Sequence, residues 1–492
     1  MSGIIGVYSV DGNNIFEELS YGLIALQHRG DRGFGFCVDN QDSDPKNWFL
    51  HESGKGLVFY DMVQNNPEKI KELSERKPTV GIGHTLYEKT GGLQPRGTWN
   101  IKGYDMMVAM DGVLLGYPAR DEVVMRAIVS KSLSEADDFF KAGELIMEEF
   151  DGRGPYNVVV NIRDYRDGEY YLIAFRDPKG IKPLCIGSRE NKYIIASESK
   201  IFQNIDADFV RDVEPGEMIV ISKKGMKDRV LVRQDHAHCA FEWVYFASPV
   251  SDIEGKNVYL VRKKLGEFLA KRYPDVDTDQ VICSPDSGRG VATGFQQALT
   301  RRRLQDIIEN SRGMKNKKEI IKYLESDLQD AFVPFEEAVE KNPTAPRTFQ
   351  IEEPILREIA SRTKFYFNEH VLKGKKSGAG DDSIVRGSVF KYGMAPKAKR
   401  LGAKTFGAII SCPPLSHACV KDPGGKTFAA LGLRGSAEEI GKKVAKDLGL
   451  DFVLYPTEED LDKAIGLTDT CKACFNGKYP VKKEFIPEDQ LG

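Results

Sequence analysis

The apolar pattern of the chain changes near His236, and this change constrains the fold more than any other feature. Before it, short β-type stretches such as IIGVYSV, YNVVVNI and YYLIAF recur between Gly, Asp and Asn turns. One helix is expected there, from about Asp121 to Glu149. After it, helical stretches such as NVYLVRKKLGEFLAKRY alternate with strands such as QVICSP, which is typical of a parallel α/β sheet. The sequence predicts a strand-rich unit, a boundary near residues 228–240, and then an α/β unit.

Length and charge narrow the class of protein. A chain of 492 residues is too long for one hydrophobic core, so two or three domains are expected. The formal net charge of −3 gives no electrostatic reason to expect nucleic acid or an anionic membrane as a partner. No apolar run approaches the ~18 residues of a spanning helix, and the N-terminus lacks a signal segment. We therefore expect a cytoplasmic protein.

Residues 300–332 are expected to form a charged helical hairpin inserted in the second unit. Apolar residues fall at helical spacing on both sides of a break at Gly313. They are Leu304, Ile307, Ile308, Ile320, Ile321, Leu324 and Leu328. Two interpretations stay open for this insert, a projection on the surface and an arm that binds a partner.

The most informative short motif is GDDSIVRGS, residues 380–388. In a sugar-phosphate site, Asp381 and Asp382 would accept hydrogen bonds from ribose hydroxyls or help position a metal ion. Ser383 and Ser388 would donate to phosphate oxygens, beside backbone N–H groups at a helix start. The alternative is an ordinary acidic loop that caps a helix. A second loop, SPDSGRG at 284–290, has the same character but is weak evidence on its own.

The N-terminus and the cysteines each leave alternatives open. Removal of Met1 would free the amine of Ser2, so Ser2 is either a nucleophile activated by that amine or the start of an ordinary strand. Cys471 and Cys474 form a CxxC pair in CKACFNGKYP, which suits a metal site, a redox pair or coincidence. Structural disulfides are not expected among the eight cysteines of a cytosolic chain.

The order of these and other motifs resembles that of the amidophosphoribosyltransferases. The motifs are MSGIIGV, LQHRG, GIGHT, RDPKGIKPL, ASES, VEPGE, FEWVYFASP, the PDSG loop, DDSIVRG and CKACFNGKYP, and they span nearly the whole chain. The resemblance implies an N-terminal nucleophile-type αββα glutaminase sandwich (2–235), a type I phosphoribosyltransferase α/β domain (236–450) and a C-terminal helical segment with the CxxC pair (451–492). Members take ammonia from glutamine and add it to phosphoribosyl pyrophosphate (PRPP), the first committed step of purine biosynthesis.

Compared with the family, the glutaminase half is degenerate in this sequence. Ser2 stands where the family has a cysteine nucleophile, and an alcohol is harder to activate than a thiol. Leu86 stands where an arginine would bind the α-carboxylate of glutamine. Asp111, followed by Gly112, replaces the asparagine of the oxyanion hole, and an ionised carboxylate would repel a developing oxyanion. We therefore expect a divergent paralogue whose first domain keeps its fold without glutaminase activity.

The phosphoribosyltransferase half matches the family better. The resemblance assigns PRPP binding, with Mg²⁺, to Asp286, Ser287, Gly288, Lys341, Arg347, Asp381, Asp382, Ser383, Arg386, Gly387 and Ser388. Two departures stand out. The strand that feeds the motif reads SGAG at 377–380, and glycines weaken a central strand. The closing loop reads KNPTAPRTF, where prolines would stiffen a segment that must move. The sequence therefore supports PRPP binding more strongly than turnover.

The cysteines match the ligand positions of family members that hold a [4Fe–4S] cluster. These positions are Cys239, Cys419, Cys471 and Cys474, and thiolates suit iron–sulfur and zinc equally. The resemblance favours iron–sulfur. The other four, Cys37, Cys185, Cys283 and Cys412, are interpreted as core residues.

Three functions follow from this comparison. The chain is a paralogue that binds PRPP and uses free ammonia, a regulatory paralogue without chemistry, or a full glutamine-dependent enzyme. We expect PRPP or a purine nucleotide as ligand and a homo-oligomer as the assembly, with pairing to an active family member as a further option.

Overall fold

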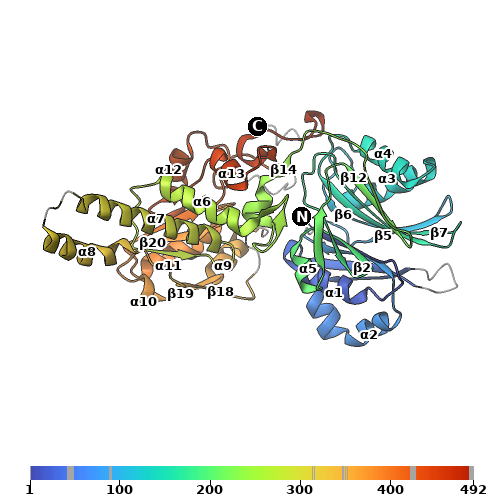
Figure 1. Cartoon of the computed structure of the whole chain (residues 1–492), viewed down its shortest axis with the longest axis horizontal. Helices are drawn as coiled ribbons and strands as arrows, with labels where there is room; N and C mark the ends of the chain where they lie inside the picture. The colour runs from blue at the N-terminus through green and yellow to red at the C-terminus, as the bar shows by residue number, and fades with distance from the viewer. Residues whose placement is uncertain are drawn as a thin grey trace.

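The first half of the chain builds two antiparallel sheets that face each other (Figure 1). The computed structural model describes residues 2–40, 49–87, 91–312, 314, 316–345, 348, 351, 353–420 and 428–486. The first sheet has the strand order β11-β9-β10-β1-β4-β2-β3 and the second the order β13-β12-β8-β7-β6-β5. Strand bounds in the first sheet are β1 Gly3–Ser9, β2 Gly33–Asp39, β3 Phe49–Lys55, β4 Val80–Leu86, β9 Cys185–Arg189, β10 Lys192–Ala196 and β11 Asp208–Asp212. Those in the second are β5 Arg96–Ile101, β6 Tyr104–Gly112, β7 Tyr156–Asp164, β8 Tyr170–Arg176, β12 Glu217–Ser222 and β13 Gly225–Val230.

Successive side chains of a strand point to opposite faces of its sheet, and this alternation explains the layers of this half. In β1, Ile5 and Val7 pack against the helices of the first sheet, whereas Ile4 and Tyr8 pack between the sheets. The first sheet is covered by α1 Phe16–Ala25, α2 Pro67–Glu75 and α5 Lys200–Asn204, and the second by α3 Asp121–Glu135 and α4 Phe139–Glu149. The result is the αββα sandwich that the resemblance implies.

The prediction of a single helix from Asp121 to Glu149 was wrong, because this segment forms two helices. Residues 136–138 separate α3 from α4, and the side chain of Asp138 accepts a hydrogen bond from the backbone N–H of Lys141. An aspartate at this position starts a helix because its carboxylate satisfies an N–H group that has no partner within the helix. The apolar spacing continues through the break, so periodicity alone did not reveal it.

The second half contains the expected parallel sheet, in the order β17-β20-β21-β22. Its strands are β17 Gln280–Cys283, β20 Lys376–Asp381, β21 Thr405–Ile410 and β22 Val453–Leu454. Its helices are α6 Val258–Arg272, α7 Arg289–Ser311, α8 Lys317–Ala331, α9 Pro354–Thr363, α10 Glu369–Leu372, α11 Ala395–Arg400 and α12 Ala437–Leu448. Because β22 belongs to this sheet, the sheet extends past the expected boundary at residue 450.

The SGAG segment forms a regular central strand despite its composition. All six residues of β20 pair with β21, and four of them also pair with β17. The glycines allow close packing, since a Cβ on Gly380 would lie 2.7 Å from the Cβ of Ala292, and one on Gly378 would lie 2.8 Å from Ile409 Cδ1. Helix α7 occupies the space that a side chain at Gly380 would take, and Ile409 of β21 occupies the space at Gly378.

The expected hairpin insert is partly an extension of a core helix. Helix α7 begins at Arg289, within the SPDSGRG segment, and is 23 residues long. Its first half packs on the sheet. Only its end and α8 project, at the side of the α/β lobe farthest from the sandwich (Figure 1). The expected break at Gly313 lies outside the described residues. No helix among the described residues is both long and apolar enough to span a membrane.

The C-terminal segment returns to the junction between the two halves (Figure 1). After α13 Glu458–Ile465, the strand β23 Thr470–Cys471 pairs in parallel with β14 His238–Cys239, which follows the linker from the sandwich. The remaining short elements are α14 Ala473–Asn476, β15 Asp252–Ile253, β16 Lys256–Asn257, β18 Val339–Lys341, β19 Phe365–Phe367, and the helical turns η1 Gln27–Arg29, η3 Phe59–Asn65, η4 Glu242–Phe246, η6 Val389–Met394 and η8 Lys483–Phe485.

Candidate functional site

The two motifs with phosphate-binding character meet at one edge of the parallel sheet. Strands β17 and β20 are parallel neighbours, with Cys283 opposite Gly380, so the loops that leave them begin side by side. Open parallel sheets bind their ligands at the carboxyl ends of the strands. The structure thus unites SPDSGRG and GDDSIVRGS, which are distant in sequence.

Close backbone packing fixes the first loop against the second strand. The N–H of Ser284 donates to the carbonyl of Gly380 at 2.8 Å. A Cβ on Gly288 would lie 2.0 Å from the same carbonyl oxygen, so only glycine fits there. Gly288 therefore serves the packing of the loop, and it does not line the adjacent cavity.

The paired acids are held by the two loops together. Ser287 Oγ and the N–H of Asp382 both donate to Asp381 Oδ1 at 2.9 Å, and Ser383 Oγ donates to Asp382 Oδ1 at 2.5 Å. Burial raises the pKa of both carboxyls, and the charge of Asp382 raises that of Asp381 further. Lys364 opposes the shift in both. The pair is thus fixed in position, and its negative charge is only partly compensated.

A cavity of about 350 Å³ opens beside these loops, within the range of small-ligand sites. The expected PRPP-binding residues that line it are Asp286, Ser287, Lys341, Asp381, Asp382, Ser383, Arg386, Gly387 and Ser388. Arg347 lies outside the described residues. Gly387 has φ +70°, and a Cβ there would lie 2.5 Å from Leu448, so the turn of the second motif requires glycine.

Several cationic residues of the cavity were missed from the sequence. Arg262 and Lys364 line it, together with Lys200, His28 and Arg29 from the sandwich half. Arg262 is buried and donates to the carbonyls of Trp243 and Ala247 at 2.8 and 2.9 Å. It lies on the face of α6 that buries Val258, Val261 and Leu265, and an arginine at such a position was a signal that the sequence offered.

At the other site, Ser2 directly precedes β1. Strand β1 pairs with β4 in a register that sets Gly3, the residue after Ser2, opposite Thr85, the residue before Leu86. Leu86 is 8% exposed and contributes only hydrocarbon there. The structure therefore brings two of the expected glutaminase positions together.

Asp111 forms a buried network with the start of the chain. The backbone nitrogen of Ser2 donates to Asp111 Oδ1 at 2.8 Å, and Lys182 Nζ donates to the same oxygen at 2.5 Å. Arg29 Nη2 lies 3.7 Å from Oδ2. Burial alone would raise the pKa of Asp111, but Lys182 and Arg29 hold it well below its usual range. Asp111 is thus an ionised carboxylate at the position of the expected oxyanion hole.

Gly112, the other residue of the expected oxyanion hole, is closely packed. A Cβ on Gly112 would lie 2.3 Å from the carbonyl oxygen of Pro155. The neighbouring His84 is fully buried, and burial lowers its pKa to about 3, so its imidazole is neutral. Lys182 and His84 were missed as parts of this site, although they lie in the quoted RDPKGIKPL and GIGHT motifs.

Arg29 connects the two sites. Its Nε donates to the carbonyl of Ser2 at 3.1 Å, and its other nitrogens bind Glu198 at 2.7 Å and Glu242 at 3.0 Å. Arg29 is buried, yet it also lines the cavity of the phosphate site. A single side chain therefore contacts Ser2 and also lines the cavity of the other half.

The four expected metal-ligating cysteines converge at the junction of the halves. The pairing of β14 with β23 sets Cys239 opposite Cys471. Burial raises the pKa of Cys474, and so does the proximity of Cys419, Cys239 and Cys471. The thiols expected in the core, Cys37, Cys185, Cys283 and Cys412, are all buried. Cys412 also raises the pKa of Cys474, so the core thiol Cys412 lies near the group.

Comparisons with known proteins agree with this architecture. The chain is 32% identical over 521 residues to the amidophosphoribosyltransferase of Methanocaldococcus jannaschii, covering 99% of this chain and 98% of that one. It is 28% identical over 499 residues to that of Bacillus subtilis, covering 97% and 94%. No protein-family model matches the chain.

Solved structures show the same likeness. The glutamine PRPP amidotransferase from B. subtilis complexed with ADP and GMP superposes with a TM-score of 0.76 at 27% identity, covering 99% of this chain and 98% of that one. A structure described as the allosteric regulatory enzyme of purine biosynthesis superposes with a TM-score of 0.77 at 26% identity, covering 99% and 97%. This chain therefore belongs to the amidophosphoribosyltransferase family.

Proposed function

We propose that this protein binds PRPP and transfers its phosphoribosyl group to free ammonia in purine biosynthesis, without hydrolysing glutamine. One observation carries the proposal. The buried carboxylate of Asp111, at the position that the resemblance assigns to the oxyanion hole, contacts the nitrogen of Ser2 at 2.8 Å. The phosphate site, in contrast, keeps its loops, its acid pair and an open cavity.

Three features argue against glutamine hydrolysis. With Met1 removed, the contact with Asp111 would keep the amine of Ser2 protonated, and a protonated amine cannot accept the proton of the hydroxyl. The negative charge of Asp111 would oppose an oxyanion, where loss of one donor already costs about a hundred- to a thousandfold in rate. Leu86 would leave the α-carboxylate of glutamine without a cationic partner.

The phosphate site has the chemistry for the transfer. The backbone around Gly387 and the hydroxyls of Ser383 and Ser388 would bind the 5′-phosphate. Asp381 and Asp382 would accept hydrogen bonds from the ribose hydroxyls. Mg²⁺ enters as part of the Mg–PRPP substrate. The ammonia lone pair forms a bond to ribose C1 while the C1–O bond breaks, and pyrophosphate leaves with that electron pair. The new ammonium group then loses a proton to solvent, which yields phosphoribosylamine.

A regulatory protein without turnover is the second candidate, and the closing loop favours it. Asn342 Oδ1 accepts hydrogen bonds from the N–H of Thr344 at 3.1 Å and from its hydroxyl at 2.8 Å, around Pro343. Pro343 fixes its own φ angle within this turn, whereas a loop that closes over a substrate must move. Such a protein would bind PRPP or a purine nucleotide and regulate a partner, which includes an active family member.

Pyrophosphate release from the full chain distinguishes the candidates. Purified protein is given PRPP and Mg²⁺ with ammonium in one set and glutamine in another. Pyrophosphate release with ammonium but not with glutamine supports the proposal. Release with glutamine would show that the chain is a full glutamine-dependent enzyme. No release, together with thermal stabilisation by PRPP or a purine nucleotide, selects the regulatory protein. Asp381→Asn should reduce release, while Asp275→Asn, an exposed control in the same half, should not.

We further infer that Cys239, Cys419, Cys471 and Cys474 hold a [4Fe–4S] cluster. A tetrahedral Zn²⁺ ion holds four thiolates about 3.8 Å apart, from Zn–S bonds of about 2.3 Å. Among the described residues, one group of three or more His, Cys, Asp or Glu ligand atoms lies within 4.8 Å of one another. That group contains no cysteine. The family resemblance favours a cluster, in which each thiolate binds its own iron. When bound, the cluster would link the C-terminal segment covalently to the junction between the two halves.

A brown, oxygen-sensitive preparation with about four irons per chain would support the cluster. One zinc and no iron would overturn it. The expected homo-oligomer and the cytoplasmic location stay predictions, and sedimentation of the purified chain tests the first of them.

A further inference from the structure

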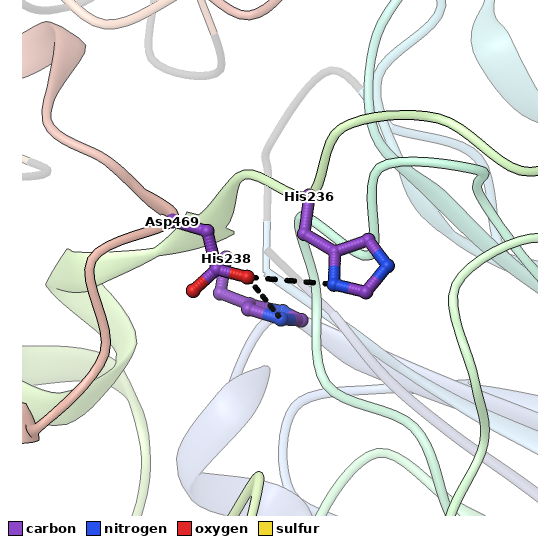
Figure 2. Close-up of side chains that lie close together, drawn as sticks. All are labelled: His236, His238 and Asp469. Carbon is purple, nitrogen blue, oxygen red and sulfur yellow. Dashed lines mark ion pairs between the residues drawn. The ribbon is translucent and has the colours of Figure 1, made fainter.

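A second group of metal-ligating side chains lies beside the cysteines. His236, His238 and Asp469 are, among the described residues, the group whose ligand atoms all lie within 4.8 Å of one another (Figure 2). His236 Nδ1 lies 3.4 Å and His238 Nε2 lies 3.9 Å from the same oxygen, Asp469 Oδ2. A tetrahedral ion with ligands at about 2.1 Å separates them by about 3.4 Å. The three atoms thus already have nearly the spacing of a metal site.

The hydrogen bonds of His238 leave its other nitrogen available for a metal. Two acceptors face Nδ1, the carbonyl of Gly180 at 2.9 Å and Glu254 Oε1 at 3.5 Å. We therefore assign the ring proton to Nδ1, which leaves the lone pair of Nε2 directed toward Asp469. Metal-bound histidines generally donate their second nitrogen in this way to a carbonyl or carboxylate.

One cation lies close to this ring and is compensated. Arg176 Nη2 is 3.4 Å from His238 Nδ1, and it donates to the carbonyl of Gly180 at 2.8 Å. Glu254 pairs with Arg176 at 2.7 Å. The positive charge therefore does not face the side of the ring that points to Asp469.

The backbone holds the site in place from two distant segments. The N–H of His238 donates to the carbonyl of Asp469 at 3.0 Å, and the register of β14 and β23 continues this contact to Thr470 and Cys471. His238 is buried, whereas His236 and Asp469 have side chains 44% and 40% exposed. An ion can enter from solvent, and water can fill a remaining coordination position.

We propose that His236, His238 and Asp469 bind a divalent transition-metal ion, with Zn²⁺ as the natural occupant, that ties the C-terminal segment to the interdomain linker. Two imidazoles and one carboxylate form a borderline-soft set that suits zinc and its neighbours better than Mg²⁺ or Ca²⁺. An exposed His236–Asp469 ion pair alone would contribute little, about 0–1 kcal/mol. Its ligands are distinct from the four thiols, although Cys239 directly follows His238 and Cys471 lies two residues after Asp469.

Cobalt binding to the full, cluster-loaded chain tests the proposal. The protein is freed of loosely bound ions with a chelator and titrated anaerobically with Co²⁺, then with Zn²⁺ in competition. We expect one equivalent of Co²⁺ with weak visible bands and without the strong near-ultraviolet charge transfer of thiolate ligands. Zn²⁺ should displace it.

Variants connect the binding to these residues. His236→Ala and Asp469→Asn each remove one exposed ligand and should weaken Co²⁺ binding at least about tenfold. His370→Ala removes an exposed histidine elsewhere and should leave binding unchanged. Equal binding in all three variants, no binding in the natural protein, or a thiolate charge-transfer band would overturn the proposal. The measurement is independent of pyrophosphate release, so it stands or fails separately from the proposed function.

Discussion

The two candidate sites use buried carboxylates in opposite ways. Asp111 has its partners inside the protein, because Lys182 and Ser2 contact the same oxygen and Arg29 faces the other. Asp381 and Asp382 lie beside an open cavity and repel each other. In the first arrangement, cations inside the protein compensate the charge, although Oδ2 of Asp111 has no hydrogen-bond partner among the described residues. In the second, the carboxylates beside the cavity are acceptors that a ligand can use. The proposed function rests on this difference, in which one compensated charge would block glutamine hydrolysis while the neighbouring site stays open to a ligand.

The pKa shifts express this difference. Lys182 and Arg29 overcome the effect of burial and lower the pKa of Asp111, so its charge stabilises the folded protein. Burial and mutual repulsion raise the pKa of Asp381, so its charge destabilises the folded protein. The same substitution, aspartate to asparagine, is thus expected to have opposite effects at the two sites.

The largest effect is expected for Asp111→Asn. Removing this charge breaks the buried contact with Lys182 and Arg29, so the free energy of unfolding at pH 7 should fall by about 3–5 kcal/mol. Because the folded pKa is depressed, this stabilisation is complete above the ordinary aspartate pKa near 4 and is lost as the pH falls below it. Urea unfolding at pH 7 and pH 3.5 measures both effects. A change below about 1 kcal/mol at pH 7 would show that the network is not the source of stability.

The next effect concerns the ligand rather than the fold. Changing Asp381 and Asp382 together to Asn should weaken PRPP binding by about a hundredfold, since hydrogen bonds to charged groups contribute about 1.5–3 kcal/mol each. Calorimetric titration with Mg–PRPP measures it, and Asp275→Asn serves as the exposed control. Unchanged affinity would mean that PRPP does not bind at this edge of the sheet.

A smaller effect of opposite sign is expected for Asp381→Asn without ligand. The neutral amide removes a repulsive buried charge, so the free energy of unfolding at pH 8 should rise by about 1–2 kcal/mol. A carboxyl whose folded pKa is raised gains stability as the pH falls from that pKa toward its ordinary value near 4. The advantage of the variant should therefore shrink at pH 5. Destabilisation at both pH values would show that the two sites do not differ in the proposed way.

Much of this contrast could be predicted from the sequence. The order of motifs predicted the αββα sandwich, the parallel sheet and nine of the residues that line the phosphate cavity, since short motifs carry backbone geometry with them. Leu86 and Asp111 were recognised because they differ from the family pattern. The structure adds that Asp111 contacts the backbone nitrogen of Ser2, and that Leu86 follows Thr85, the residue opposite Gly3.

What the sequence could not show depends on long-range packing. The compensation of Asp111 comes from Lys182, 71 residues away, and from Arg29 in a separate turn. The sequence predicted that the glycines of SGAG destabilise the strand. It could not show that helix α7 packs against Gly380. The pairing of His238 with Thr470 likewise joins segments that no local pattern connects.

The smallest effect is expected for Ser2, and it tests the comparison most directly. The contacts of Ser2 with Asp111 and Arg29 use its backbone nitrogen and carbonyl, so Ser2→Ala should change the free energy of unfolding by less than about 0.5 kcal/mol. Pyrophosphate release with ammonium should be unchanged as well. Ser2→Cys should likewise produce no glutamate from glutamine, because a better nucleophile still faces the charge of Asp111 and the hydrocarbon of Leu86. Glutamate formation by the natural chain that Ser2→Ala abolishes would show that the first site is a working glutaminase.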